Sequence, residues 1–314
     1  MKAQYIIKIL RLPDIKPGRY IVAVSGGVDS MVLLDLLQKT PGIEIIVAHF
    51  DHGIREESQQ DRKFVQNYAM SHNLFFVYKC VVLGSGASEE SARKARYGFL
   101  RHSCKKYNAL AIIMAHHQDD LLETAVINLL RGTGRNGLTS LRSHKQLLRP
   151  MLEFSKIQII NYAKERGLLW REDKTNSDTK YLRNYIRQKI LKNIDEPTRK
   201  KLQLIIVRHF ALNQQIDTEL NNLQKKFCTI NLVKNFALLP RYLLVMLPTD
   251  VSYELLQKTL KDLTGNTVVR NVANQALLFA KTAKNDKKFE LGSFWQLRVL
   301  DAQIIVEPKV NMIS

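Results

Sequence analysis

The sequence lacks the features that mark membrane, secreted and disulfide-bonded proteins. No apolar run approaches the roughly 20 residues that a membrane-spanning helix requires. The N-terminal stretch MKAQYIIKILRL carries Lys8 and Arg11 inside its apolar part, which argues against a secretory signal peptide. Three cysteines, Cys80, Cys104 and Cys228, lie far apart, so neither a disulfide framework nor a C-x-x-C metal or redox site is expected. These absences predict a cytoplasmic protein with reduced, mostly buried thiols and no membrane partner.

Acidic residues are scarce in comparison with basic ones. The 314 residues include 48 Lys and Arg against 29 Asp and Glu, which gives a net charge of +19. Residues 101–200 hold 20 basic and 10 acidic residues, so this region contributes +10 of the excess. A nucleic acid is the expected partner, because a polyanion gains affinity from counterion release and from long-range attraction. A solvated basic face without a partner is the alternative.

Apolar runs alternate with helical patterns through the first half of the chain. The runs RYIVAV, IEIIVAHF, LFFVYKCVV and ALAIIMAHH are followed by expected helices from Ser30, from about Glu57, from Glu89 and from Asp119. This alternation predicts an α/β fold with a doubly wound parallel sheet, and continuous apolar runs suit strands that are covered on both faces. The polar clusters SGGVDS, HFDHG and AHHQDD follow three of the strands, where ligands bind in such folds.

The segment SGGVDS joins the first expected strand to a helix. Gly26 and Gly27 tolerate positive φ and let backbone N–H groups close on an anion, and the helix start adds its own N–H groups. Ser25 and Ser30 can donate to phosphate, whereas Asp29 repels phosphate unless a divalent cation lies between them. The pattern indicates a nucleotide with Mg²⁺, and an ordinary capped turn is the alternative. The chain has no G-x-x-x-x-G-K-S/T, and the glycine spacing of this loop is not G-x-G-x-x-G; without the lysine of the first motif, γ-phosphoryl transfer is disfavoured.

Four further blocks follow this loop in a characteristic order. They are AHFDHGIREES, ASEESARKARYGFL, AHHQDDLLETAVINLLRGTGRNGLTSL and RPMLEFSKIQIINYAKERGLLWREDKTNSDTKYLRNYIRQKIL. The loop is similar to the S-G-G-x-D-S loop of the N-type ATP pyrophosphatases, and the ordered set resembles the tRNA(Ile)-lysidine synthetases within that group. The resemblance covers about residues 20–195 and implies an adenine nucleotide α-hydrolase-like fold with a PP-loop.

The resemblance implies a reaction as well as a fold. Enzymes of this family join L-lysine to C2 of the wobble cytidine of an isoleucine tRNA with a CAU anticodon. ATP would contact the loop residues Ser25, Gly26, Gly27, Val28, Asp29 and Ser30. The cytosine O2 would attack the α-phosphate, pyrophosphate would leave, and lysine would then displace AMP from C2.

Carboxylates near the fourth run form the second half of the expected site. Asp120, Glu123 and Thr124 lie within one helical turn, so one helix face presents several oxygen atoms. Mg²⁺ takes few protein carboxylates and keeps phosphates and waters, so Asp29 with Asp120 makes a reasonable site. Asp119 is the alternative ligand or the N-cap of the helix. A helix cap formed by both aspartates, without a metal, is the other interpretation.

Four histidines lie near the ends of two expected strands: His49, His52, His116 and His117. At least one of His116 and His117 must point toward the ligand edge, where an imidazole could stabilise the leaving pyrophosphate. His49 and His52 are expected to face the adenosine or to support the residues that do, with histidines that only satisfy structural hydrogen bonds as the alternative. A zinc site is the alternative, but neither H-E-x-x-H nor a His-Asp dipeptide occurs in the chain.

Arginines in two of the blocks are candidates for substrate contacts. Arg93 and Arg96 lie three residues apart on one helix face, and Arg96 matches the Arg-Tyr pair of the family, which implies a phosphate or intermediate contact. Arg131 and Arg135 belong to RGTGRNGL, whose glycines end a helix and form a flexible basic loop that could contact tRNA. A solvated helix face and a plain helix-ending turn are the respective alternatives.

The segment YLRNYIRQKI is predicted to pack against the protein through one helix face and to bind tRNA through another. Tyr181 and Tyr185 share one helix face, while Arg183 and Arg187 share another. Guanidinium groups suit phosphate and the edge of a base, which must leave its stack because C2 of a paired cytosine is inaccessible. Arg183 and Arg187 are therefore expected to bind tRNA, with a salt-bridged surface helix as the alternative.

The C-terminal third of the chain has a different character. We expect a catalytic domain at residues 1–212 and a smaller, mostly helical domain at residues 213–314 that grips tRNA. A helix is expected near Tyr253, Arg270 is expected to be exposed, and WQLRVL and AQIIVEP have a β pattern. A stabilising or dimerising module is the alternative, so a homodimer stays open.

Two other classes of function compete with lysidine formation. A tRNA thiolase also adenylates a base but delivers sulfur through cysteines, and this chain has no C-x-x-C to hold a cluster or relay a persulfide. A non-catalytic ATP-sensing or RNA-binding module would keep the glycine loop and the basic face without needing an acidic pair. The block HHQDD therefore favours an enzyme.

Overall fold

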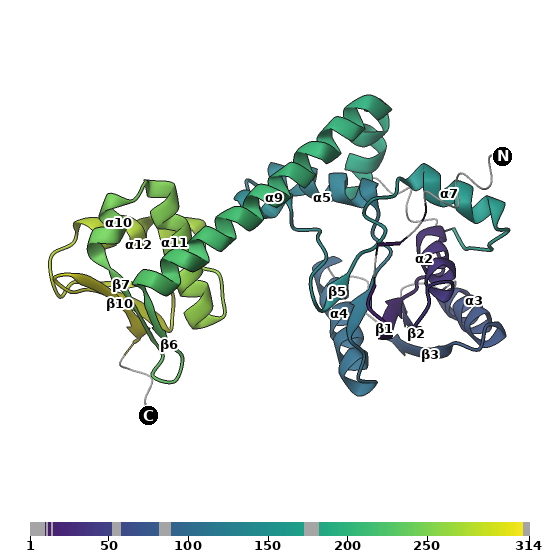
Figure 1. Cartoon of the computed structure of the whole chain (residues 1–314), viewed down its shortest axis with the longest axis horizontal. Coiled ribbons are helices and arrows are strands. Elements are labelled where there is room, and N and C mark those ends of the chain that lie inside the picture. Colours follow the sequence, from purple (N-terminus) through teal and green to yellow (C-terminus); the bar gives the residue numbers. More distant parts are fainter. Residues whose placement is uncertain are drawn as a thin grey trace. The chain divides into compact units, whose positions relative to one another are not determined.

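The computed structural model describes residues 10, 12–13, 15–51, 58–81, 89–172 and 182–309. The chain forms two compact units, Met1–Phe210 and Ala211–Ser314 (Figure 1). Helix α9 (Glu196–Phe227) begins in the first unit and ends in the second. None of the helices among the described residues is long and apolar enough to cross a membrane.

The first unit is built on a parallel β-sheet in the order β3-β2-β1-β4-β5. Its strands are β1 (Gly18–Ala23), β2 (Ile43–Asp51), β3 (Phe75–Cys80), β4 (Ala111–Ile113) and β5 (Leu147–Leu148). Every pairing between them is parallel, which confirms the predicted doubly wound sheet. The chain runs outward from β1 to β3 and then returns to β4 on the other side of β1. A ligand crevice is expected where this order reverses, at the carboxyl ends of β1 and β4.

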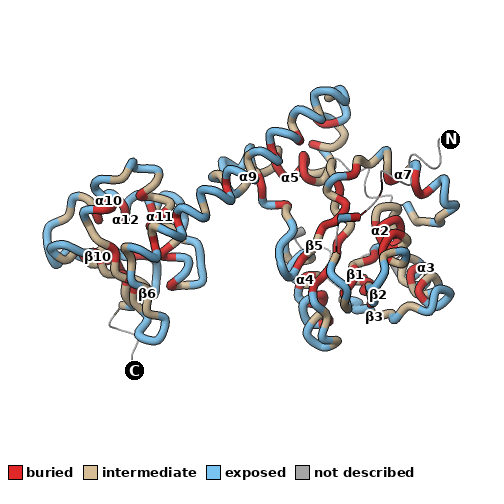
Figure 2. Tube along the Cα trace, in the orientation of Figure 1, coloured by how far each residue is buried: buried red, intermediate tan, exposed pale blue. Residues whose placement is uncertain are grey.

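Helices cover both faces of this sheet (Figure 1). Before α9 the unit contains α2 (Val28–Gln38), α3 (Ser58–Ser71), α4 (Glu89–Lys106), α5 (Gln118–Leu130), α6 (Arg135–Leu138), α7 (Lys156–Glu165) and α8 (Leu182–Tyr185). The core formed with α2, α3 and α7 includes Val22 and Val47, whereas the core formed with α4 includes Ile21 and Ile46. Neighbouring residues of one strand enter opposite cores because side chains alternate across a sheet. Buried residues accordingly concentrate in the central strands and in α2 (Figure 2).

A further core joins α5 to the segment that follows α8. This segment consists of a π-helical turn, η2 (Ile186–Ile190), and a 3₁₀ turn, η3 (Leu191–Asn193). Ile186 is fully buried in a cluster with Leu122 of α5 and Ile206 of α9. The packing places the side chains of α8 and η2 beside α5, close to the end of β4.

Two element boundaries differ from those that the sequence predicts. α2 begins at Val28 rather than at Ser30, because Gly27 is the N-cap and has extended backbone with ψ of 161°. Asp29 and Ser30 therefore lie in the first helical turn. The run ALAIIMAHH forms only the short strand β4, and the chain continues through His117, which is extended and caps α5.

The second unit packs helices against an antiparallel sheet of order β6-β7-β10-β9-β8. Its elements after α9 are β6 (Thr229–Asn231), β7 (Phe236–Pro240), α10 (Arg241–Met246), α11 (Thr249–Thr264), α12 (Arg270–Thr282), β8 (Lys288–Glu290), β9 (Trp295–Val299) and β10 (Gln303–Pro308). Alternate strand residues such as Leu297 and Val299 are fully buried, as is typical of a sheet with one covered face. The helix around Tyr253, the β pattern of WQLRVL and AQIIVEP and the exposure of Arg270 are confirmed.

Candidate active site

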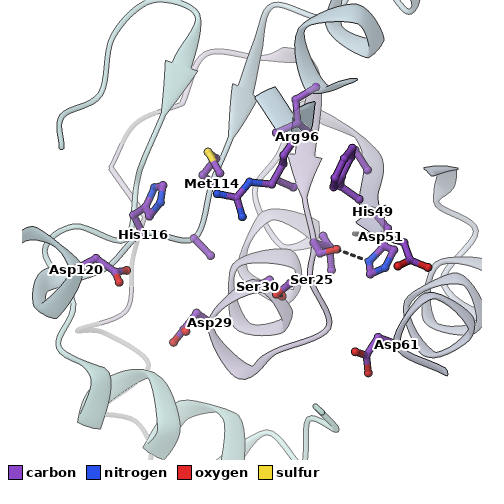
Figure 3. A pocket seen from close by; sticks show the side chains of 16 residues that line it. Ser25, Asp29, Ser30, His49, Asp51, Asp61, Arg96, Met114, His116 and Asp120 are labelled. Carbon is purple, nitrogen blue, oxygen red and sulfur yellow. Dashed lines mark hydrogen bonds between the residues drawn. The ribbon is translucent and has the colours of Figure 1, made fainter. Parts of the chain in front are cut away.

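A cavity of about 410 Å³ opens at the carboxyl ends of β1, β2 and β4 and is called the β1 cavity below. Its size lies within the range of small-ligand pockets. The predicted site residues that line it are Ser25, Asp29, Ser30, His49, Arg96, His116 and Asp120 (Figure 3). The other predicted residues are not part of its lining; they are Gly26, Gly27, Val28, His117, Arg131, Arg135, Arg183 and Arg187.

The loop Ser25–Ser30 is closed by its own hydrogen bonds. Gly26 has φ of +94°, the left-handed region that favours glycine. Gly27 has φ of −74°, so of the two glycines that tolerate positive φ only Gly26 adopts it. The buried Ser30 hydroxyl donates to the Gly27 carbonyl over 2.9 Å and accepts the Gly26 N–H over 3.2 Å. Ser30 therefore fixes the shape of the loop, while Ser25 is exposed at the cavity.

A distant segment supports this loop. The Arg171 backbone N–H donates to the Gly26 carbonyl over 2.9 Å. The Arg171 guanidinium forms an ion pair with Asp61 of α3, and Asp61 also lines the β1 cavity. A Cβ at position 26 would meet Val65 Cγ2 of α3 at 3.3 Å. Backbone conformation and close packing together therefore require glycine at this position.

Asp29 has a cationic partner that the sequence did not predict. The Lys156 Nζ lies 2.6 and 2.7 Å from the two carboxylate oxygens of Asp29. Lys156 is the first residue of α7, and Ser155 caps that helix through reciprocal hydrogen bonds with Gln158. The cap fixes the helix start, and the ammonium group holds the Asp29 carboxylate in one orientation beside the cavity.

His117 links the two carboxylates that are predicted to hold a metal. It is the N-cap of α5, where its Nδ1 accepts the Asp119 N–H over 3.2 Å and Asp120 Oδ2 accepts the His117 N–H over 3.0 Å. The His117 Nε2 lies 3.8 Å from Asp29 Oδ1 and 3.5 Å from Asp120 Oδ2. Asp29 and Asp120 therefore converge on one imidazole although they belong to different helices.

The two neighbouring aspartates of α5 have separate partners. Asp119 is not the N-cap, and its Oδ2 lies 3.4 Å from the Arg199 Nη1. Burial acts to raise the pKa of Asp120, but the nearby His117 and His116 outweigh it, so this pKa is lowered. Asp120 is therefore ionised. It completes the helix cap and also lines the cavity, and its role as a metal ligand stays a prediction.

His116 is held as a neutral hydrogen-bond donor. Burial lowers the pKa of His116 to about 3, and the nearby Arg149 adds to this effect against the opposing influence of Asp120. The Arg149 Nε donates to His116 Nδ1 over 3.0 Å. Because a guanidinium group only donates, Nδ1 must accept and the ring proton lies on Nε2. Of the neutral and protonated forms that the sequence left open, the structure favours the neutral one.

His49 is a second neutral imidazole at this cavity. It is buried, which lowers its pKa, and its Nδ1 lies 2.9 Å from the Val24 carbonyl oxygen (Figure 3). A carbonyl oxygen only accepts, so Nδ1 carries the proton and Nε2 is left as an acceptor. His52, the remaining histidine of the predicted set, lies outside the described residues.

Arg183 and Arg187 both contact one buried carboxylate. Glu123 of α5 is fully buried, and burial raises its pKa against the opposing effect of Arg187. Arg187 donates to Glu123 twice, over 2.6 and 3.0 Å, and the Arg183 Nε lies 3.4 Å from it. Arg187 Nη2 also lies 3.5 Å from Asp120 Oδ1. The two arginines share one face, as predicted, but that face packs on α5, and their contact with tRNA stays a prediction.

The arginines of the glycine-rich segment lie on α5 and α6. Arg131 is the exposed C-cap of α5. Arg135 begins the one-turn helix α6 and is half-buried, and its carbonyl accepts from His209 Nε2 over 3.2 Å. The segment expected to be a flexible loop therefore contains a short helix. Contacts of both arginines with tRNA stay predictions, and Tyr181 lies outside the described residues.

Two arginines of α4 face different hollows of the first unit. Arg96 reaches into the β1 cavity, as Figure 3 shows. Arg93 lines a separate groove together with Tyr97 and does not join Arg96 in the cavity. The spacing of three residues thus divides these side chains between two sites, although the sequence predicted one face for both.

The donor set of the cavity suits a hard cation. Within the part of the chain that the structure describes, no group of three or more His, Cys, Asp or Glu side chains is arranged to hold a metal ion, and His52 of the predicted zinc set lies outside that part. Asp29 and Asp120 offer carboxylate oxygens, which Mg²⁺ uses together with phosphates and waters. All three cysteines are free, and Cys80 is exposed rather than buried as expected. None of them lines the β1 cavity.

Comparison with known proteins relates the chain to tRNA-modifying enzymes. The family model of the PP-loop domain matches residues 1–194. A tRNA(Ile)-lysidine synthase of Thermotoga sp. (strain RQ2) is 42% identical over 207 residues, which are 62% of this chain and 50% of that protein. A tRNA(Ile)-lysidine synthase of Francisella tularensis subsp. holarctica is 29% identical over 314 residues, which are 96% of this chain and 77% of that protein.

A solved structure shares the fold with little sequence identity. The U34-tRNA thiolase NcsA from Methanococcus maripaludis matches with a TM-score of 0.55 and 14% identity, over 67% of this chain and 80% of that chain. This likeness concerns the fold alone. The chain spans about half the length of several of the curated relatives that it matches. The PP-loop match covers more than half of the residues, and the chain therefore belongs to the PP-loop domain family.

Proposed function

We propose that this chain is a tRNA(Ile)-lysidine synthetase. It adenylates the wobble cytidine of isoleucine tRNA with a CAU anticodon and then replaces AMP with L-lysine. The observation that carries the proposal is the convergence of Asp29 and Asp120 on His117, beside the glycine loop and the β1 cavity. The names of similar proteins support this substrate and product. The net charge of +19 supports a polyanionic partner.

The glycine loop supplies a binding site for the phosphates of ATP. The first turn of α2 has backbone N–H groups without partners inside the helix, at the positive end of the helix dipole. Lys156 and Arg96 add positive charge near this end of α2. His49 presents an acceptor nitrogen, which suits the exocyclic amino group of adenine.

Adenylation forms one bond at the α-phosphorus and breaks another. The cytosine O2 bonds to the α-phosphorus, and the bond to the bridging oxygen breaks so that the electron pair leaves with pyrophosphate. The neutral Nε2–H of His116 can donate a hydrogen bond to the departing group without giving up its proton. Mg²⁺ bound by Asp29 and Asp120 would neutralise phosphate charge during this step.

Lysine transfer completes the reaction in the same cavity. An uncharged amine nitrogen of lysine bonds to C2 and releases one proton to solvent, the bond from C2 to O2 breaks, and AMP leaves with that oxygen. The cavity is lined by four carboxylates, those of Asp29, Asp51, Asp61 and Asp120. Their negative charge supports the entry of a substrate that carries ammonium groups.

The remaining parts of the molecule belong to the same proposal. The unit Ala211–Ser314 and the exposed Arg131 would grip tRNA away from the reacting base. An enzyme that modifies tRNA by this route would act in the cytoplasm. A thiolase is less well supported, because no cysteine lines the β1 cavity to carry sulfur.

The direct test is product analysis with purified protein. Isoleucine tRNA with a CAU anticodon is incubated with ATP and Mg²⁺, with and without free lysine, and pyrophosphate and the wobble nucleoside are measured. The proposal expects tRNA-dependent pyrophosphate and a cytidine that gains the mass of lysine less water. The matched control is the same tRNA with guanine at the wobble position, which offers no cytosine O2. Pyrophosphate without a lysine adduct would indicate another nucleophile, and no pyrophosphate would indicate a binding module.

A further inference from the structure

A second hollow of the first unit, of about 730 Å³, lies between α4 and the β4–β5 edge of the sheet. We call it the α4 groove. Its lining includes Arg93, Arg101 and Lys105 of α4, and His144 and Arg149 on either side of β5. No carboxylate is among the described residues that line it. Neither the nucleotide loop nor the carboxylates of the proposed reaction belong to this groove.

The cations of α4 form a row along one helix face. Arg93, Tyr97, Arg101 and Lys105 follow one another at intervals of four residues, which places them on one side of the helix. At a rise of about 1.5 Å per residue, successive members lie about 6 Å apart and the row spans about 18 Å. A row of this length exceeds what one small anion needs and suits an extended polyanion.

Among the described residues, no acidic side chain forms an ion pair with the cations of the row. Arg93, Arg101 and Lys105 are exposed, and none of them takes part in an ion pair between described residues. Lys94 of the same helix differs, because its Nζ lies 3.4 Å from Glu90. The guanidinium groups of Arg93 and Arg101 lie 5.3 and 5.9 Å from the ring centre of Tyr97, which holds them at the groove. Their mutual repulsion is relieved by a polyanion.

The α4 groove and the β1 cavity share a wall. Arg149 lines the groove, and its Nε donates to Nδ1 of His116, which lines the cavity. On α4, Arg93 lines the groove while Arg96, one turn further on, lines the cavity. A strand of nucleic acid that lies in the groove therefore has an adjoining nucleotide within reach of the cavity.

We propose that the α4 groove binds the phosphate backbone of the substrate RNA next to the nucleotide that enters the β1 cavity. This inference rests on the proposed function and names the surface that presents the substrate. Guanidinium and ammonium groups bind phosphate through charge-assisted hydrogen bonds. Such contacts fix the register of the strand and carry no base information. The groove therefore positions the RNA, and base selection occurs elsewhere.

The test compares two double variants with the same change of charge. R101E/K105E reverses two cations of the groove, whereas K106E/K164E reverses two exposed lysines outside it. Lys106 lies on α4, about 140° around the helix from Arg101. Isoleucine tRNA binding is measured by fluorescence anisotropy over a series of salt concentrations. R101E/K105E is expected to bind at least about tenfold more weakly, with a salt slope that is shallower by roughly 1 to 2. K106E/K164E should stay within about twofold of the wild type.

Lysine adduct formation by the wild type separates this inference from the proposed function. If the wild type forms the adduct and R101E/K105E binds tRNA as tightly as K106E/K164E, the groove proposal is overturned and the function stands. If tRNA binding depends on Arg101 and Lys105 but no pyrophosphate is released, the groove proposal is supported and the proposed function is contradicted. An equal loss of tRNA affinity in both variants would show an effect of overall charge and would also overturn the groove proposal. The milder R101Q/K105Q replaces R101E/K105E if thermal unfolding reveals a folding defect.

Discussion

The β1 cavity and the α4 groove are adjoining hollows with opposite charge balance. The cavity contains four aspartates together with His116, His49 and Arg96, and both imidazoles are held by defined partners. The groove is lined by the exposed cations of α4, by the buried Arg149 and by no described carboxylate. Bond-making chemistry needs pre-organised groups of both signs, whereas backbone binding needs positive charge. Substitutions in the cavity should therefore lower rates, and substitutions in the groove should lower affinity.

The largest expected effect comes from the carboxylate of the glycine loop. D29N should lower tRNA-dependent pyrophosphate release at saturating substrates by about 10²-fold or more, because it removes a carboxylate ligand of the Mg²⁺ that would neutralise the phosphate charge. D35N is the matched control, since Asp35 lies on the same helix and also contacts a lysine, Lys39, at 2.6 Å. Pyrophosphate assays on both variants check this. Near-normal turnover by D29N would contradict the site assignment.

A smaller effect is expected from the buried carboxylate of α5. E123A leaves Arg187 and Arg183 without their shared partner and should lower the free energy of unfolding by about 2 kcal/mol. E44A is the control, because the Glu44–Arg19 pair is exposed at 2.8 Å and should contribute at most about 0.5 kcal/mol. Urea denaturation measures both values. Equal losses of unfolding free energy in E123A and E44A would mean that the buried Glu123 cluster stabilises the fold no more than an exposed ion pair does.

The third prediction compares the tRNA affinity of a cavity variant with that of a groove variant. D29N should keep its tRNA affinity within about twofold of the wild type, while R101E/K105E should lose at least about tenfold. Exposed, uniformly positive groups act through phosphate contacts, and Asp29 does not contact RNA phosphate in this account. Anisotropy titrations at several salt concentrations make the comparison. A loss of affinity in D29N as large as that in R101E/K105E would remove the distinction between rate and affinity.

The smallest expected effect concerns pH. The pKa of His116 is about 3 in the folded protein, below its ordinary value of 6.5, so the unfolded chain binds a proton in this range that the folded chain does not. The resulting stabilisation is fully present above pH 6.5 and is lost as pH falls toward 3. The midpoint temperature of thermal unfolding should therefore fall more between pH 7 and pH 5 for the wild type than for H116Q. H102Q, which changes an exposed histidine, should behave like the wild type.

The glycine loop, whose residues are contiguous in the chain, could be predicted from the sequence. Ser25 to Ser30 are consecutive, and a strand that ends in glycines before a helix has few conformations open to it. The parallel sheet followed from the alternation of apolar runs and helices for similar reasons. The φ of Gly27 could not be assigned, because two adjacent glycines carry the same local signal.

The partners that orient these groups could not be predicted, because they come from distant parts of the chain. Lys156 lies 127 residues from Asp29, Arg187 lies 64 from Glu123, and Arg149 lies 33 from His116. Each contact depends on how α7, η2 and β5 pack, and β5 has only two residues and carries no pattern. Arg183 and Arg187 show the consequence. Their spacing predicted a shared face, but tertiary packing decided what that face contacts.

Transfer of label from ATP to tRNA would reveal an adenylated tRNA intermediate. ATP labelled in its α-phosphate is incubated with the protein and CAU-anticodon isoleucine tRNA without lysine, and the tRNA is then isolated. We expect label in the tRNA, its loss as AMP when lysine is added, and no label with D29N. Absence of label in the tRNA under conditions where wild-type protein releases pyrophosphate would contradict an adenylated tRNA intermediate.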